Sequence, residues 1–151
     1  MNLTRRTTLG LLAATIAAPA FAKQAVVFTK GGLAIAGYDP VAYFTEKDAF
    51  KGSTKYSLMW HGATWRFKSA ENKALFEADP KKYAPQYGGY CAYAMASGDY
   101  VSINPKAWDI YNGKLYLNYS SIIWAIWSRD RAGYVARADK HWPAENIAPQ
   151  S

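Results

Sequence analysis

Two short aromatic-rich runs, residues 56–60 and 63–67, stand on either side of the dipeptide His61-Gly62. Aromatic residues favour strands, and a two-residue link that contains glycine suits the tight turn of a β-hairpin. The sequence therefore predicts an antiparallel hairpin at this place. It is the strongest constraint on the fold, because rings of this size on a hairpin must become part of a hydrophobic core.

Further strand signals lie near both ends of the chain. Residues 25–36 indicate two short strands around a glycine pair, and Asn112-Gly113 is a tight-turn pair that leads into residues 114–119. Apolar and polar side chains alternate along this last run, as they do in a half-buried strand. We therefore expect a second region of β-structure in the C-terminal half.

Helix signals fall between and after these strands. Ser69 is a good N-cap for a helix over residues 71–78, and Asp79-Pro80 ends that helix because a residue before proline avoids the helical region. Residues 121–134 form a helical region that is interrupted near its middle. The fold class predicted is α+β: a small single domain of antiparallel β-hairpins packed with short helices.

The N-terminus is typical of a cleavable export signal. Residues 1–22 combine a basic head, an apolar run of residues 9–18 and small residues at the end. The pair Arg5-Arg6 suits the twin-arginine route, although ordinary secretory signals also carry arginine pairs. We therefore expect a periplasmic or secreted protein whose domain covers residues 23–151 and ends in a mobile tail.

The net charge and its distribution argue against nucleic acid as a partner. The chain carries a formal net charge of +7, but no dense stripe of Lys and Arg is present. Solubility is the commoner reason for such a charge, so we expect no nucleic acid as a partner. No apolar segment after the export signal is long enough to anchor the mature chain in a membrane.

Cys91 is the only cysteine of the chain, and Met95 follows it at helical spacing. That spacing places both sulfurs on one face of a helix, and a thiolate with a thioether suits Cu(I). His61 completes the predicted metal site, with Met59 and His141 as further donors. The alternative is a structural cysteine and a methionine that fills a gap in the core.

Tyrosine side chains are the second set of candidate binding residues. Aromatic walls with a carboxylate suit a small organic or cationic ligand. Ordinary core packing, with the carboxylate in a local turn, is the alternative for the same residues. The residues predicted to bind such a ligand or cofactor are Tyr38, Asp39, Tyr90 and Tyr93, with Tyr43, Tyr87 and Trp108 as neighbours.

Several motifs together resemble the YHS domain and, within it, an exported single-domain branch. They are Trp65-x-Phe67-x-Ser69, Phe76, Asp79-Pro80-x-x-Tyr83, and the stretches 37–44, 87–93 and 113–118. The resemblance implies a small α+β domain and a role in binding metals, copper especially. Metal-binding relatives carry cysteines at the places that Lys68 and Asn72 hold here, so the cysteine site of the family is absent from this chain.

A third interpretation concerns Gly88-Gly89, which precede Cys91. Glycines let the backbone turn tightly and bring amide groups close to a thiol, which would then serve as a redox group. The sequence favours a binding module over an enzyme. Transition-metal binding, with copper first, is the leading hypothesis. A metal-free ligand or protein-interaction module comes next, and a thiol redox protein comes last.

Overall fold

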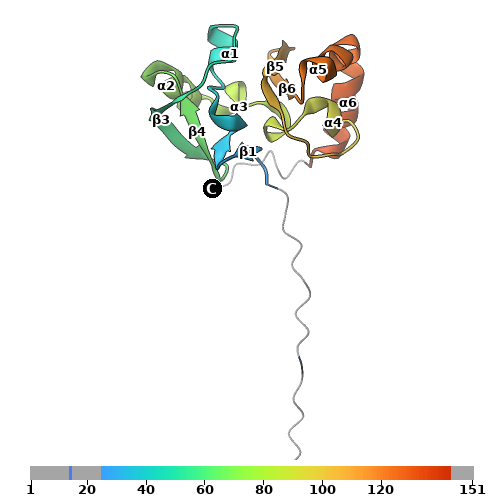
Figure 1. The fold of residues 1–151 in the computed structure, drawn as a ribbon, viewed down its shortest axis with the longest axis horizontal. Coiled ribbons are helices and arrows are strands. Elements are labelled where there is room, and N and C mark those ends of the chain that lie inside the picture. The colour runs from blue at the N-terminus through green and yellow to red at the C-terminus, as the bar shows by residue number, and fades with distance from the viewer. Residues whose placement is uncertain (1–13, 15–24, 144–151) are drawn as a thin grey trace, which may run out of the picture.

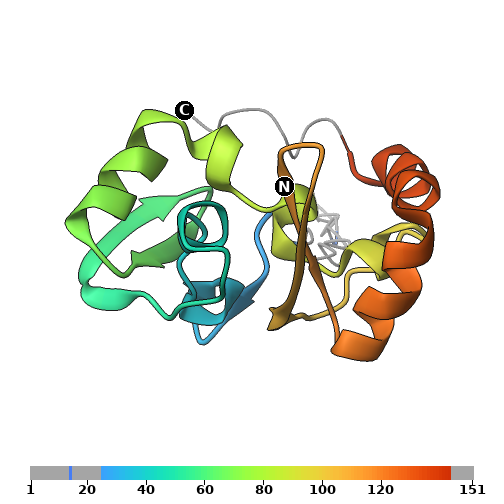
Figure 2. The same cartoon turned by 90° about the horizontal axis from the view of Figure 1, so that it is seen from above.

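The computed structural model describes residue 14 and residues 25–143. The predicted export signal and the predicted C-terminal tail, apart from residue 14 and the last residues of the domain, lie outside this range. Two lobes stand side by side, one built from the first half of the chain and the other from the second (Figure 1). Seen from above, the segment around α3 (Pro80–Tyr83) joins the lobes (Figure 2).

The first lobe is a four-stranded sheet with helices packed on it. Its elements are β1 (Thr29–Lys30), β2 (Leu33–Ala34), the 3-10 turn η1 (Ile35–Gly37), α1 (Ala42–Thr45), β3 (Ser53–Trp60), β4 (Ala63–Phe67) and α2 (Ala70–Ala78). The strand order is β1-β2-β4-β3. Strands β3 and β4 pair antiparallel with Trp60 opposite Ala63, whereas β2 pairs with β4 in parallel.

The second lobe is a β-hairpin covered by helices. After α3 come the 3-10 segment η2 (Gln86–Gly89), α4 (Ala92–Met95), β5 (Asn104–Tyr111), β6 (Lys114–Asn118), α5 (Ser121–Trp127), η3 (Ser128–Asp130) and α6 (Arg131–His141). Strands β5 and β6 pair antiparallel, with Tyr111 opposite Lys114. Helices α4 and α6 pack against each other beside this hairpin (Figure 1).

Side-chain caps begin four of the helices. The hydroxyl of Ser69 accepts a hydrogen bond from the Asn72 amide at 3.1 Å, and the carboxylate of Asp79 accepts one from the Lys82 amide at 3.2 Å. Ser120 caps α5 and Asp130 caps α6 in the same way. Each cap satisfies an amide that the first helical turn leaves without a partner.

Strand β6 joins two hydrophobic cores because successive side chains of a strand point to opposite faces. Leu115 and Leu117 enter the first core, where Trp65 and Phe76 are also buried. Tyr116, between them, enters the second core beside Trp127. The two lobes thus share a strand and form one domain.

The predicted fold class is confirmed, and most local predictions agree with the structure. The 56–67 hairpin, the helix capped by Ser69, the strand after Asn112-Gly113 and the interrupted final helix are all present. Two features were not predicted. Strand β5 was missed, and the parallel pairing of β2 with β4 departs from a set of purely antiparallel hairpins.

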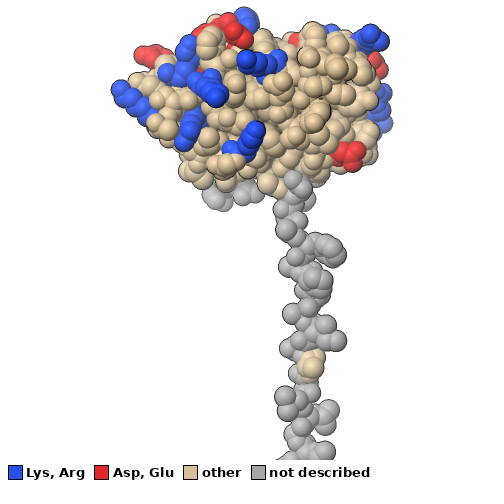
Figure 3. Space-filling model, in the orientation of Figure 1, with Lys and Arg blue, Asp and Glu red and all other residues tan. Residues whose placement is uncertain are grey.

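No described helix is long and apolar enough to cross a membrane. On the face shown in Figure 3, more of the basic side chains lie over the lobe that holds β3, β4 and α2 than over the other lobe. Acidic side chains interrupt them near α1. The charge on this face is therefore mixed rather than a continuous basic stripe.

Candidate functional site

A cavity of about 400 Å³ opens where the two lobes meet, and this volume is in the range of small-molecule sites. Its walls come from the segment before β1, the β3–β4 hairpin, the stretch from α3 to η2, the start of β6, and α6 with the residue that follows it. The lining residues are Val26, Val27, Trp60, His61, Trp65, Lys81, Ala84, Pro85, Gln86, Tyr87, Gly88, Lys114, Asp139 and Trp142. The cavity thus depends on elements far apart in the sequence.

Two tryptophans fix one wall of the cavity. The indole Nε1 of Trp65 donates a hydrogen bond to the backbone oxygen of Trp60 at 3.0 Å, and the two rings lie 5.7 Å apart at 63°. Trp60 also meets Phe76 edge to face at 5.4 Å. These contacts hold Trp60 in place although it is only half-buried, so it offers a preformed aromatic surface.

The hairpin turn brings His61 to the same wall. Both His61 (φ 49°) and Gly62 (φ 74°) lie in the left-handed region, which is the geometry of a tight two-residue hairpin turn. The His61 ring then lies 3.9 Å from the Trp60 ring. Partial burial, and next the charge of Lys81, lowers the pKa of His61 below its ordinary value.

The opposite wall is formed by η2 and α6. The hydroxyl of Tyr87 donates a hydrogen bond to Oδ1 of Asp139 at 2.9 Å, and the Tyr87 and Trp142 rings lie 6.2 Å apart. Burial, and next the bond to Asp139, raises the pKa of Tyr87, so its hydroxyl keeps its proton. The Phe28 amide donates to the Gly88 oxygen at 2.9 Å and closes the wall on the N-terminal side.

Asp39, predicted as a ligand-binding carboxylate, is fully buried away from the cavity. Its Oδ1 accepts from the amides of Val41 and Ala42 at 2.8 and 3.3 Å. Its Oδ2 accepts from the Lys68 amide at 2.9 Å and from Nδ2 of Asn72 at 2.8 Å. Both oxygens are therefore engaged by the protein itself, as the turn interpretation of this residue expects.

The three tyrosines predicted with Asp39 are distributed over both lobes, and none lines the cavity. Tyr38 packs against the first core. Tyr90 donates from its hydroxyl to the Ala25 oxygen at 3.0 Å, and the Tyr93 ring lies 5.1 Å from the Tyr134 ring at an angle of 40°. The structure does not bring these residues together around one ligand, although Tyr87, named beside them, does line the cavity.

The predicted sulfur pair lies in the second lobe. The Met95 amide donates to the Cys91 oxygen at 3.0 Å, so the two residues are one helical turn apart as predicted. Both side chains are buried, and the Cys91 thiol donates to Oδ1 of Asn118 at 3.8 Å. His61 lies at the cavity instead, and neither Cys91 nor Met95 is among the described residues that line it.

These surroundings fit a neutral thiol better than a Cu(I) ligand. Burial raises the pKa of Cys91 above its ordinary value of 9.0, and the backbone amides of Ala94, Tyr119 and Tyr93 oppose this effect only in part. An amide oxygen is a hard donor, whereas Cu(I) prefers thiolate, thioether or imidazole. Within the described part of the chain, no three His, Cys, Asp or Glu side chains gather as a possible ion site.

The thiol of Cys91 is expected to be unreactive in the folded protein. Because it is buried and protonated, we expect it to react with a disulfide reagent at about pH 8 at least a hundred-fold more slowly than in the urea-unfolded chain. The pKa of Cys91 is higher in the folded than in the unfolded state. Its contribution to the free energy of unfolding is therefore fully present below the unfolded pKa of 9.0 and is lost as the pH rises through the folded pKa. Thiol titration measures the reaction rate, and equal rates in the folded and unfolded states would contradict the first expectation. Urea unfolding of the wild type and Cys91→Ala against pH measures the change in stability, and an identical pH dependence of the two proteins would contradict the second.

The fold and the cavity define a small α+β domain with an aromatic cavity between two cores. The model of the YHS domain family matches residues 41–87, about a third of the chain, which confirms the resemblance of this stretch to the YHS domain. No curated protein and no solved structure matches the chain. The family match ends at Tyr87 within the cavity wall, so Lys114, Asp139 and Trp142 are contributed by the part of the chain after the match.

Sequence reasoning missed most of the residues that line the cavity. His61 was proposed as a metal ligand, and the glycine pair at 88–89 was recognised as a place where the backbone comes close to another group. Lys81, Lys114 and Asp139 carried no signal, because each is an ordinary charged residue on a different element. Only tertiary packing brings them to one opening.

Proposed function

We propose that the protein is a binding module that holds a small aromatic molecule in the cavity between its two cores. The cavity itself carries this proposal: its volume is about 400 Å³, and aromatic rings from both lobes line it together with several polar side chains. The rings of Trp60 and Tyr87 are fixed by contacts within the protein, so a planar ligand would enter a preformed site. We propose further that it acts outside the cytoplasm, on the strength of the signal-like N-terminus.

Metal binding is a second hypothesis with weaker structural support. The buried thiol of Cys91 and its amide-oxygen partner do not form a soft donor set, and His61 lies at the cavity. Copper binding by Cys91, Met95 and His61 therefore stays a prediction from the sequence. The aromatic cavity has the stronger physical basis and is the function we propose.

A neutral aromatic probe tests the aromatic site. We expect 2-naphthamide to bind the full chain with one-to-one stoichiometry in isothermal titration calorimetry. Trp60→Ala should weaken binding about ten-fold, since it removes one ring of the wall. Trp108→Ala is the matched control, because Trp108 is also half-buried and contacts Tyr43 at 5.3 Å but does not line the cavity.

A second variant covers the case in which Trp60→Ala is poorly folded. Val26→Trp replaces a half-buried valine at the edge of the first core with a larger ring that should fill the cavity. We expect it to abolish binding while urea unfolding stays close to that of the wild type. Binding that is absent from the wild type, or that survives in both cavity variants, would overturn the proposed function.

A further inference from the structure

The lining of the cavity carries more positive than negative charge. Lys81 from α3 and Lys114 from the start of β6 line it, and Asp139 is the one carboxylate among the described lining residues. Both lysines are exposed. Neither forms an ion pair within residues 25–143, whereas Lys68 and Lys73 each have a carboxylate partner. Two cationic groups are therefore available to a bound molecule.

One carboxylate oxygen of Asp139 is already engaged within the protein. Its Oδ1 accepts the hydrogen bond of Tyr87 at 2.9 Å, so this carboxylate holds the far wall. His61 stands on the same side as Lys81, close enough for the lysine charge to act on the imidazole. An anionic group bound in the cavity would be attracted by Lys81 and Lys114, and the aromatic walls would hold its ring.

We infer that the preferred ligand of this cavity is a planar aromatic anion about the size of a bicyclic carboxylate. The inference rests on the proposed function and adds the sign of the ligand's charge. Its ring would lie between Trp60 and Tyr87, and its carboxylate would point toward the lysines at the opening. Exposed ion pairs contribute modestly, so the rings supply most of the affinity and the lysines supply selectivity.

Three probes of one shape isolate the charge. 2-Naphthoate, 2-naphthamide and 2-naphthamidine share the same ring and a planar head group and differ in being anionic, neutral or cationic at neutral pH. We expect calorimetry to show 2-naphthoate binding about five-fold tighter than 2-naphthamide, from two exposed ion pairs, and 2-naphthamidine binding more weakly than either. Raising the salt concentration should reduce the advantage of the anion.

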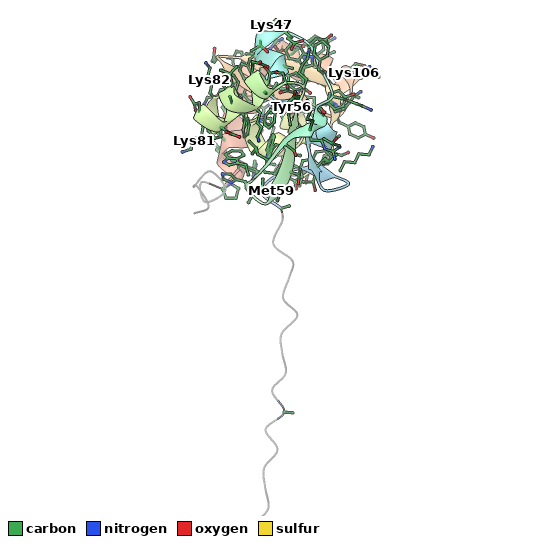
Figure 4. The ribbon with its side chains drawn as sticks, turned by 90° about the vertical axis from the view of Figure 1, so that its left-hand side faces the viewer. Lys47, Tyr56, Met59, Lys81, Lys82 and Lys106 are labelled. Atoms are coloured by element: carbon green, nitrogen blue, oxygen red, sulfur yellow. The ribbon has the colours of Figure 1, made fainter. Side chains whose placement is uncertain are left out.

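Neighbouring lysines on one helix provide a matched pair of variants. Lys81 lines the cavity, whereas Lys82 lies next to it with its Nζ 5.0 Å from the centre of the Tyr83 ring and does not line the cavity (Figure 4). Lys81→Gln and Lys114→Gln should each reduce the preference for naphthoate over naphthamide about two-fold. Lys82→Gln removes the same formal charge from the same helix and should leave the preference unchanged.

The outcomes separate this inference from the proposed function. If 2-naphthamide binds in the cavity and 2-naphthoate binds no better, the inference about charge is overturned while the proposed function stands. If the amidine binds best, the carboxylate of Asp139 outweighs the two lysines and the inference is again overturned. If Lys82→Gln reduces the preference for the anion as much as Lys81→Gln does, the preference reflects the overall charge of the protein. That result also contradicts the assignment of Lys81 to the ligand. If none of the three binds, the proposed function itself fails.

Discussion

Asp39→Ala is expected to unfold the protein or to lower its free energy of unfolding by about 4 kcal/mol or more, since each buried donor left without a partner costs roughly 1–3 kcal/mol. The carboxylate is fully buried and accepts four hydrogen bonds, from the amides of Val41, Ala42 and Lys68 and from Nδ2 of Asn72. Alanine leaves all four donors unpaired. Domains of this size have only about 5–15 kcal/mol of stability in total, so the loss is a large share.

Asp39→Asn refines this prediction. The side-chain oxygen of the new asparagine can still accept from the backbone amides of Val41 and Ala42. Its NH₂ group, however, points toward the donors of Lys68 and Asn72. We expect an intermediate loss of about 2–3 kcal/mol, because two donors then face another donor. The midpoint of urea unfolding, followed by circular dichroism, measures both variants.

Asp48→Ala is the matched control for this network. Asp48 also accepts a backbone hydrogen bond, from Ala49 at 2.7 Å, but it is exposed and water can replace the bond. Its loss should change stability by less than about 1 kcal/mol. A loss of similar size for Asp39→Ala would mean that the four bonds do not hold the first lobe together.

The same network bears on the resemblance to the YHS domain. Lys68 and Asn72 occupy the places where the YHS resemblance puts cysteines in metal-binding relatives. Here the Lys68 amide and the Asn72 side chain both donate to Asp39, which ties the end of β4 and the start of α2 to the turn before α1. In this protein both positions support the fold through Asp39, and neither residue lines the cavity.

Local signals in the sequence predicted the local structure well. His61-Gly62 and Ser69 determine, respectively, a turn and a helix start within a few residues of themselves, and both are found as predicted. Such features depend on backbone geometry and nearby hydrogen bonds, which are readable from residue types. Strand β5 was missed because its sequence contains Pro105 and charged residues and reads as a strand only when paired with β6.

Long-range packing was not predictable in the same way. The parallel pairing of β2 with β4 and the sharing of β6 between two cores require the whole chain. The cavity arises from this packing, so its charged residues could not be picked out from the sequence. Predicted candidates such as Tyr38 and Tyr93 were chosen for their chemistry, but the fold places them in separate packing clusters.

Gly88→Ala is expected to lower the free energy of unfolding by about 3 kcal/mol or more and to abolish ligand binding. Gly88 has φ 62°, and a Cβ built on it would lie 1.8 Å from the backbone oxygen of Val26 and 3.2 Å from the Trp142 ring. The obstacle is backbone, so the segment before β1 must move. That movement breaks the bond from the Phe28 amide to the Gly88 oxygen and displaces the wall of the cavity.

Gly62→Ala separates this contact from backbone strain alone. Gly62 also has a positive φ, 74°, but a Cβ there would meet nothing within 4 Å. Left-handed backbone at a non-glycine residue costs about 1–2 kcal/mol, so this variant should lose that amount and no more. Urea unfolding of the two variants, with calorimetry of 2-naphthamide binding, gives the comparison. Equal losses of stability in both variants would show that the close approach of Gly88 to Val26 does not hold the cavity wall in place. The larger loss expected for Gly88→Ala, together with lost binding, would show that the cavity and the fold depend on the same contact.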